Sequence, residues 1–231
     1  MSASAKRKIL YVSGSRADYG PVRDLLRAID ESDNLDLGVL VTAMHLKAEH
    51  GMTVNEIASD GFEIVARVAA AQDDDSLMMM SKSFGEIVTG IGRELARHSP
   101  DILLLLGDRG EQLSAAIAGA IQNITIVHLC GGGNSGSIDD SFRHAISKFA
   151  HYHLPISETH ARRLMQMGEL PETIYVVGLP GGTLGAGFTG AMIPTTTRAT
   201  LLKVLENQDE GKPSDVMKIL LEETLMEGVK E

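Results

Sequence analysis

The residues best suited to chemistry are concentrated between His128 and His153. Within this stretch, three consecutive glycines at 131–133 allow a ligand to approach the backbone closely and permit dihedral angles that other residues avoid. Asp140 and His144 follow at i,i+4 spacing on a predicted helix. Carboxylate and basic side chains at the start of a helix, behind a glycine loop, suit an anionic ligand with proton-transfer groups nearby.

The same stretch also has a purely structural interpretation. Ser137 stands three residues before Asp140, which is the spacing of a capping box. From Ile138 onward, apolar residues recur on one face of a helix. A well-capped surface helix therefore explains the stretch about as well as an anion site does.

The elements that must position these residues follow from the apolar pattern along the chain. Short apolar runs alternate with amphipathic segments, which predicts a parallel sheet covered by helices on both faces, a doubly wound α/β fold. We expect strands at 9–13, 35–42, 62–68, 102–106, 124–128, 153–156 and 175–177. We expect helices beginning near Pro21 and near Ile138, and at 54–59, 73–97, 112–121 and 158–167.

Polar residues follow four of the predicted strands. Since ligands bind beyond the carboxyl ends of parallel strands, these residues are expected to meet at one edge of the sheet. They are Ser15 and Arg16, then His45, then Asp108 and Arg109, and finally the turn from His128 to Gly133. Loops are polar in general, but that alone does not explain the repeated arginine, histidine and aspartate.

The composition changes after Gly178. Residues 178–190 contain six glycines, which is typical of a linker or loop, and two modest helices are predicted at 197–206 and 214–227. We therefore expect one domain at 1–180 and a short helical appendage at 181–231. The apolar stripes of the two helices are expected to pack on the first domain, where they could cover the site edge, or on another chain.

Bulk properties exclude several classes of function. The net charge is −10 and the basic residues are scattered, which argues against a nucleic-acid partner. Cys130 is the only cysteine, no apolar run reaches membrane-spanning length, and the N-terminus does not resemble a signal peptide, so a cytoplasmic protein without a membrane partner is expected. The sequence contains no phosphate loop, no dinucleotide fingerprint and no metal-ligand spacing, so we expect neither a cofactor nor a metal.

Four groups of motifs resemble the hydrolysing UDP-N-acetylglucosamine 2-epimerases, and most closely the sialic-acid-pathway branch. They are Gly-Ser-Arg-Ala-Asp-Tyr-Gly at 14–20, Thr-Ala-Met-His-Leu at 42–46, Leu-Gly-Asp-Arg at 106–109, and Gly-Ser-Ile-Asp-Asp-Ser at 136–141 with Arg-His-Ala-Ile at 143–146 and Ala-His-Tyr-His at 150–153. The resemblance covers roughly residues 8–180. It implies one Rossmann-like half of a two-domain, glycosyltransferase-B-type epimerase.

The resemblance also implies a reaction and roles for individual residues. In the family, a base removes the C2 proton of the sugar, UDP leaves, and water adds to the glycal to give N-acetylmannosamine. The catalytic candidates by matching position are Asp108, Asp139, Asp140, Arg143 and His144. The candidates for binding the UDP-sugar are Ser15, Arg16, His45, Arg109, His128, Gly131, Gly132, Ser137, His151 and His153.

Two of these assignments compete with structural alternatives. His151 and His153 would share one face of a strand and are explained equally well as a satisfied core pair. Arg143 is four residues after Asp139, so it could simply pair with that residue along the helix.

The sequence departs from the family pattern in two respects. Where the family has a histidine and a catalytic glutamate around the glycine pair, this chain has Cys130 and Gly133. The family also has a second domain after the position of Gly178. We therefore expect one of three things: an epimerase that works as a homo-oligomer or with a partner chain supplying the other domain, a binding protein for a nucleotide-sugar or a partner, or a truncated product with little turnover.

Overall fold

The computed structural model describes residues 6–70, 76–178 and 202–206. Its strands are β1 (Arg7–Ser13), β2 (Leu35–Thr42), β3 (Ile64–Val68), β4 (Ile102–Leu106), β5 (Thr125–Leu129) and β6 (Tyr152–Leu154). Its α-helices are α1 (Arg16–Asp30), α2 (Val54–Ser59), α3 (Leu77–His98), α4 (Gly110–Ile121), α5 (Asp139–Phe149) and α6 (Glu158–Gln166). Three short 3₁₀ helices are η1 (Ala43–Leu46), η2 (Ala48–His50) and η3 (Pro171–Thr173).

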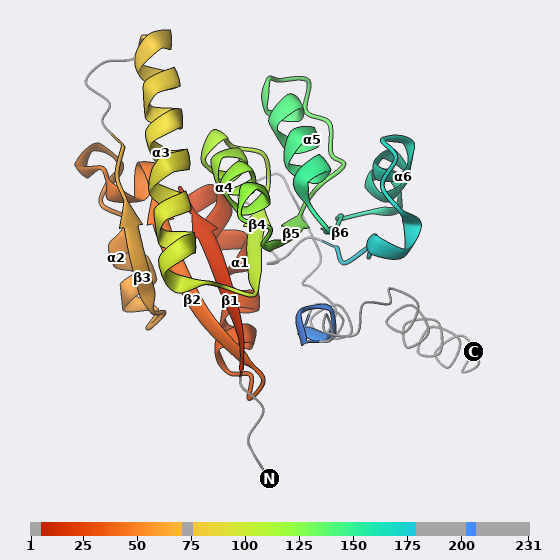
Figure 1. Cartoon of the computed structure of the whole chain (residues 1–231), viewed down its shortest axis with the longest axis horizontal. Helices are drawn as coiled ribbons and strands as arrows, with labels where there is room; N and C mark the ends of the chain where they lie inside the picture. The colour runs from red at the N-terminus through yellow and green to blue at the C-terminus, as the bar shows by residue number, and fades with distance from the viewer. Residues whose placement is uncertain (1–5, 71–75, 179–201, 207–231) are drawn as a thin grey trace.

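The six strands form one parallel sheet in the order β3-β2-β1-β4-β5-β6. Helices α1 and α2 pack on one face of the sheet, and α3, α4 and α5 pack on the other (Figure 1). The predicted doubly wound α/β fold is therefore confirmed. None of the helices in the described ranges has the length and apolarity needed to cross a membrane.

The central strand β4 shows why these sequences form this sheet. Ile102, Leu104 and Leu106 point into the core on the α1 side. Leu103 and Leu105 point into the core on the α3 side. Because successive side chains of a strand face opposite ways, only an unbroken apolar run can fill both cores.

The seventh predicted strand, at 175–177, is not formed as a strand. The Tyr175 N–H donates to the His153 carbonyl at 2.9 Å and the Val177 N–H donates to the Pro155 carbonyl at 3.0 Å, but the pairing amounts to one isolated bridge between His153 and Ile174. Pro155 has no N–H, so the ladder beside β6 cannot continue through it. The segment still buries Tyr175 and Val177 at the sheet edge.

Helix α1 begins five residues earlier than the prediction near Pro21. Ser15 is its N-cap, and Asp18 completes a capping box with it, so the helix starts at Arg16 and contains Pro21. Helix α3 begins at Leu77. The predicted start of that helix at 73–75 lies outside the described residues.

Part of the predicted appendage packs on the first domain. Residues 202–206 form a helical turn in which Val204 and Leu205 are buried in the core on the α1 side. The Arg7 side chain donates to the Leu205 carbonyl at 3.2 Å, and Ser32 donates to Glu206 at 3.0 Å. This turn therefore lies near the amino end of β1, away from the predicted site edge. The predicted helix at 214–227 lies outside the described residues.

The packing of this turn predicts a cost for truncating Leu205, which is fully buried. We expect Leu205→Ala to lower the free energy of unfolding by about 2–5 kcal/mol, because the cavity it leaves is not filled by neighbours. Leu170→Ala is the matched control, since Leu170 is 58% exposed, and we expect it to cost at most about 0.5 kcal/mol. Urea denaturation measures both, and equal stabilities would contradict the packing of residues 202–206.

Candidate functional site

The predicted site residues leave four adjacent strands at their carboxyl ends. Arg16 follows β1, His45 follows β2, Asp108 follows β4 and Gly131 follows β5. The sheet order places β2, β1, β4 and β5 side by side, so all four exits lie along one edge. This is the edge where parallel sheets bind ligands.

Arg143 of α5 connects two of the predicted catalytic carboxylates. Its Nη2 contacts Asp108 at the exit of β4, and its Nη1 donates to Asp140 at 2.7 Å. The arginine side chain is only 11% exposed, whereas Asp108 is 26% exposed. The pair that the i,i+4 spacing with Asp139 suggested is not formed, because the guanidinium reaches across to β4 instead.

Asp140 is held as an ionised carboxylate. It accepts hydrogen bonds from the N–H groups of Ser135 and Gly136, both at 2.7 Å, and from the Ser135 hydroxyl at 2.9 Å. Desolvation raises the pKa of Asp140, but these hydrogen bonds outweigh it and the pKa is lowered overall. Asp140 thus fixes both the loop before α5 and the position of Arg143.

The start of α5 differs from the predicted capping box. The N-cap is Ile138, and the Ser137 hydroxyl instead accepts the Asp139 N–H at 3.2 Å and donates to the Asp139 carboxylate at 3.1 Å. Asp140 reaches back to residues 135 and 136 rather than capping with Ser137. Ser137 is exposed and Asp139 is half-buried, so both can reach a ligand at this edge.

His144 lies one residue after Arg143 and is half-buried. Its Nδ1 is buried and has no hydrogen-bond partner in the described part of the chain. Burial lowers the pKa of His144, Asp140 raises it, and Arg143 and Arg163 lower it further, for a net decrease. The imidazole is therefore neutral at neutral pH.

Asp18 organises the turn after β1, and the sequence reasoning missed it. Its carboxylate contacts the Ser13 hydroxyl and accepts the N–H groups of Gly14 and Ser15, each at 3.0 Å, and the Ser15 hydroxyl at 3.2 Å. Burial raises the pKa of Asp18 to about 7, although the bonds from Ser13 and Gly14 oppose this. The signal was available, because Ser15 and Asp18 have capping-box spacing at the first strand exit.

His45 is fully buried and extends this network to the exit of β2. Its Nε2 is 2.8 Å from the Ser13 hydroxyl and its Nδ1 is 2.6 Å from the Thr53 hydroxyl. Burial lowers the pKa of His45. A neutral ring that donates from Nε2 to Ser13 and accepts at Nδ1 from Thr53 satisfies every group, with Ser13 donating onward to Asp18.

Two arginines at this edge point toward solvent. Arg16 has a side chain that is 67% exposed and forms an ion pair with Glu56 of α2. Arg109 donates from Nε to Glu111 at 3.1 Å and approaches the Met44 sulfur at 3.5 Å. Glu111 is buried and lies against Gly14. Position 14 must therefore be glycine, because a Cβ there would collide with the Cγ of Glu111.

Three histidines lie in β5, in β6 or directly before β6, and they are buried to different degrees. His128 is fully buried, with its Nε2 2.8 Å from the Gly107 carbonyl and its Nδ1 3.1 Å from the Ser147 hydroxyl. His153 is buried, with its Nε2 3.2 Å from Glu169. His151 is exposed and accepts the Ile126 N–H at 3.1 Å, near the amino end of β5. The structure therefore does not bring His151 to the carboxyl edge.

The glycine turn after β5 lies between two helices. Gly131, Gly132 and Gly133 are all buried. A Cβ at position 133 would lie 3.2 Å from the Arg143 Nη1, and the Gly132 carbonyl is contacted by Arg163 of α6. Sequence reasoning also missed Arg163 and its neighbour His160, because helix α6 matches none of the motifs.

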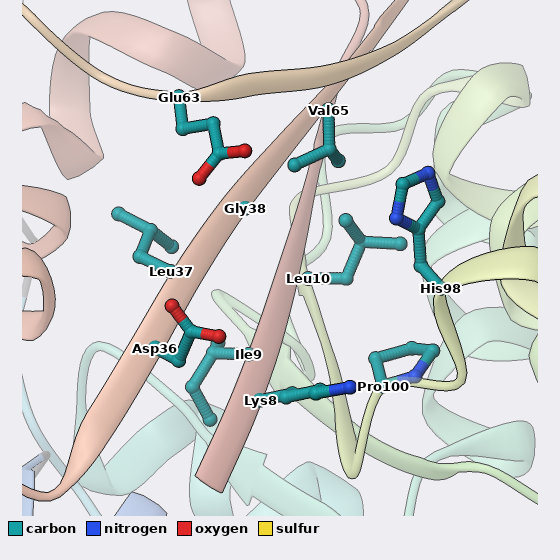
Figure 2. A pocket seen from close by; sticks show the side chains of 10 residues that line it. All are labelled: Lys8, Ile9, Leu10, Asp36, Leu37, Gly38, Glu63, Val65, His98 and Pro100. Atoms are coloured by element: carbon teal, nitrogen blue, oxygen red, sulfur yellow. The ribbon is translucent and has the colours of Figure 1, made fainter. Parts of the chain in front are cut away.

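Two surface cavities lie elsewhere on the molecule. One, of about 170 Å³, is lined by residues of β1, β2 and the α3–β4 loop, among them Lys8, Asp36 and Pro100 (Figure 2). The other, of about 660 Å³, lies between β3 and α3. Neither is lined by any of the predicted site residues.

Comparisons with known proteins identify the family of the chain. Residues 27–184 match the protein family described as UDP-N-acetylglucosamine 2-epimerase. The chain is 47% identical, over 175 residues, to the hydrolysing UDP-N,N'-diacetylbacillosamine 2-epimerase of Legionella pneumophila. The matched region covers 76% of this chain and 46% of the relative. The chain is also 34% identical, over 174 residues, to the UDP-N-acetylglucosamine 2-epimerase of Neisseria meningitidis serogroup B, covering 75% of this chain and 45% of the relative.

A solved structure shows the same fold. The crystal structure of the UDP-GlcNAc 2-epimerase from Neisseria meningitidis bound to UDP-GlcNAc is similar with a TM-score of 0.66 at 18% sequence identity, over 75% of this chain and 47% of that one. This chain spans about half the length of the curated relatives it matches.

The buried His128 predicts acid sensitivity. Burial lowers its pKa from 6.5 to about 4, so the unfolded chain takes up a proton near pH 6.5 while the folded protein does not. The stability that this residue contributes is present above pH 6.5 and is lost as the pH falls toward about 4, by roughly 3 kcal/mol in all. Urea denaturation at a series of pH values should show a shallower loss in His128→Gln, which can keep both hydrogen bonds.

The matched control is His50→Gln, because His50 is an exposed histidine on η2. We expect this variant to lose stability with falling pH as steeply as the wild type does. The prediction is wrong if His128→Gln and wild type have the same dependence.

Proposed function

Because the chain belongs to the UDP-N-acetylglucosamine 2-epimerase family, we propose that its carboxyl edge forms one wall of a site for UDP-N-acetylglucosamine or a related UDP-sugar. The proposed reaction is the hydrolysing 2-epimerisation, which gives N-acetylmannosamine and UDP. The observation that carries the proposal is the placement of Arg143 between Asp108 and Asp140. This arrangement combines a cation that can stabilise developing negative charge with carboxylates that can move protons.

The proposed roles follow from how each carboxylate is bound. Asp140 accepts three hydrogen bonds from residues 135 and 136 and pairs with Arg143, so it acts by positioning that arginine. Asp108 is the most exposed member of the network and is the candidate for proton transfer at C2 of the sugar. Asp139 is the second candidate, since among the described residues its carboxylate is hydrogen-bonded only by the exposed Ser137. Removal of the C2 proton and departure of UDP give a glycal, to which water adds.

The nucleotide is expected to contact the exits of β1 and β2. Arg16 is exposed, and its partner Glu56 lies on the neighbouring helix α2. A diphosphate approaching this edge would compete with Glu56 for the guanidinium. His45 supports this region from below, because it is buried and connects the two strand exits through Ser13.

A second candidate function is binding without turnover, and Gly133 favours it. Position 133 faces Arg143 but has no side chain, so it can neither take nor give a proton. The relatives are also about twice as long as the matched region. We therefore propose that the chain alone binds a nucleotide-sugar or a partner and that turnover needs a second domain, supplied by another chain or another copy.

Two features support a cytoplasmic protein with a protein partner. Cys130 is the only cysteine, which suits a reducing compartment. At the start of α3, which extends beyond the rest of that helical layer (Figure 1), Leu77, Met78 and Met80 are 82%, 76% and 56% exposed. Exposed apolar clusters of this kind mark protein–protein contacts.

The direct test is incubation of the pure chain with UDP-N-acetylglucosamine and measurement of UDP and N-acetylmannosamine. We expect little or no turnover but measurable binding of UDP. Arg143→Lys should weaken sugar-nucleotide binding, because a lysine cannot bridge Asp108 and Asp140 as the planar guanidinium does. Turnover by the isolated chain at a rate comparable to that of the two-domain relatives would contradict the role given to position 133.

A chimera tests the contribution of position 133 itself. Residues 1–180 of this chain would be fused to the carboxyl-terminal half of the Legionella pneumophila relative, with either Gly133 or the Gly133→Glu substitution. We expect the substituted chimera to release UDP at least about tenfold faster, since restoring one member of a cooperating set commonly recovers orders of magnitude in rate. The same substitution in the isolated chain should have no effect on turnover, and equal rates in the two chimeras would refute the assignment.

A further inference from the structure

The turn after β5 contains three buried glycines whose N–H groups have no partner in the part of the chain that the structure describes. Gly131, Gly132 and Gly133 are buried, yet their N–H groups make no hydrogen bond to any described residue. Buried backbone donors are almost always paired in folded proteins, with protein, water or a bound ion. Three consecutive unpaired donors therefore indicate that something outside the chain binds them.

The backbone of this turn alternates in the sign of φ. The angle φ is +64° at Cys130 and +75° at Gly132, whereas Gly131 and Gly133 do not have positive φ. Successive N–H groups in turns that alternate in this way can together bind an anion. Position 132 cannot carry a side chain, since a Cβ at Gly132 would lie 2.4 Å from the His160 carbonyl.

Two guanidinium groups contact the turn at 131–133. Arg143 lies against Gly133, and its Nη1 and Nη2 are used by Asp140 and Asp108, while its Nε has no partner in the described structure. Arg163 reaches the Gly132 carbonyl with Nη1 and leaves its other donors free of described partners. The carboxylates balance the charge of Arg143, but no acidic side chain pairs with Arg163 among the described residues.

Two imidazoles complete the surroundings. The Nδ1 atoms of His144 and His160 are buried and have no partner in the described ranges. Burial lowers the pKa of His160, and the charges of Arg163 and Arg143 lower it further. The region between α5 and α6 thus contains Arg163, which has no acidic partner among the described residues, and two imidazole nitrogens without partners.

We propose that the turn at 131–133, together with Arg143 and Arg163, is a binding site for one small oxyanion, a phosphate or a carboxylate group. The groups without described partners at this turn are backbone and guanidinium donors, so the ligand must be rich in acceptors and negatively charged. Because Gly133 has no side chain, the anion can approach the Nε of Arg143. This inference rests on the proposed function in that Arg143 and the turn also belong to the proposed UDP-sugar site, but binding of the oxyanion can be measured without turnover.

The experiment titrates the full chain with inorganic phosphate, and in a separate arm with acetate, at constant ionic strength. Two-dimensional amide NMR reports on the N–H groups directly. We expect saturable downfield shifts of the Gly131, Gly132 and Gly133 amide protons. The arm that saturates at lower concentration identifies a phosphate or a carboxylate as the preferred group.

Three variants make the assignment specific. Arg163→Gln should weaken binding at least about tenfold, because a charged hydrogen-bond donor is lost. Arg162→Gln is the matched control on the same helix, where Arg162 is exposed and donates only to Thr159, and it should bind as the wild type does. Gly133→Glu places a tethered carboxylate in the site and should abolish phosphate and acetate binding, and circular dichroism checks that each variant is folded.

The proposal is overturned if neither anion shifts the three glycine amides. It is also overturned if Arg163→Gln and Arg162→Gln weaken binding equally, since that would indicate a diffuse electrostatic effect. If Gly133→Glu does not fold, the comparison of the two arginine variants decides the question alone. No turnover is measured, so failure here is distinct from failure of the proposed epimerase function.

Discussion

The contact between Arg143 and two carboxylates is the interaction on which the candidate site depends. It joins the exit of β4, through Asp108, to the first turn of α5, through Asp140. The guanidinium is almost buried, and a buried cation is tolerated only when charged partners surround it. Removing either aspartate would leave one side of the guanidinium without its partner, so the three side chains form one unit in which position and ionisation state are set together.

A second buried carboxylate organises the neighbouring strand exit in a different way. Asp18 accepts backbone and hydroxyl donors from residues 13–15 rather than pairing with a cation. Its pKa of about 7 follows from burial without such a counter-charge. The turn after β1 is therefore stabilised by an internal carboxyl group, whereas the turn after β5 has none among the described residues and its N–H groups have no described partner. The contrast explains why only the second turn has the features of an oxyanion site.

The sheet supplies the rigidity that both turns need. Four adjacent parallel strands end along one edge, and each is buried on both faces, so the residues that follow them start from fixed backbone positions. Residues that carry the chemistry lie on the connections, which can vary without disturbing the core. Gly133 is such a variation, since it changes what the edge can do while the strands around it keep their apolar pattern.

The sequence by itself determined six of the seven expected strands, most helices and the edge where the motif residues gather, because apolar periodicity and the alternation of strands with helices are visible in short stretches of sequence. Only the tertiary structure decided the partners. The i,i+4 spacing on the helix suggested that Arg143 pairs with Asp139. The guanidinium instead contacts Asp108, which lies 35 residues earlier in the sequence. The sequence pattern likewise does not distinguish His151 from His153, which are two residues apart. In the structure, His151 is exposed near the amino end of β5, whereas His153 is buried against Glu169. Contacts between distant segments depend on strand order and helix rotation, which no short pattern encodes.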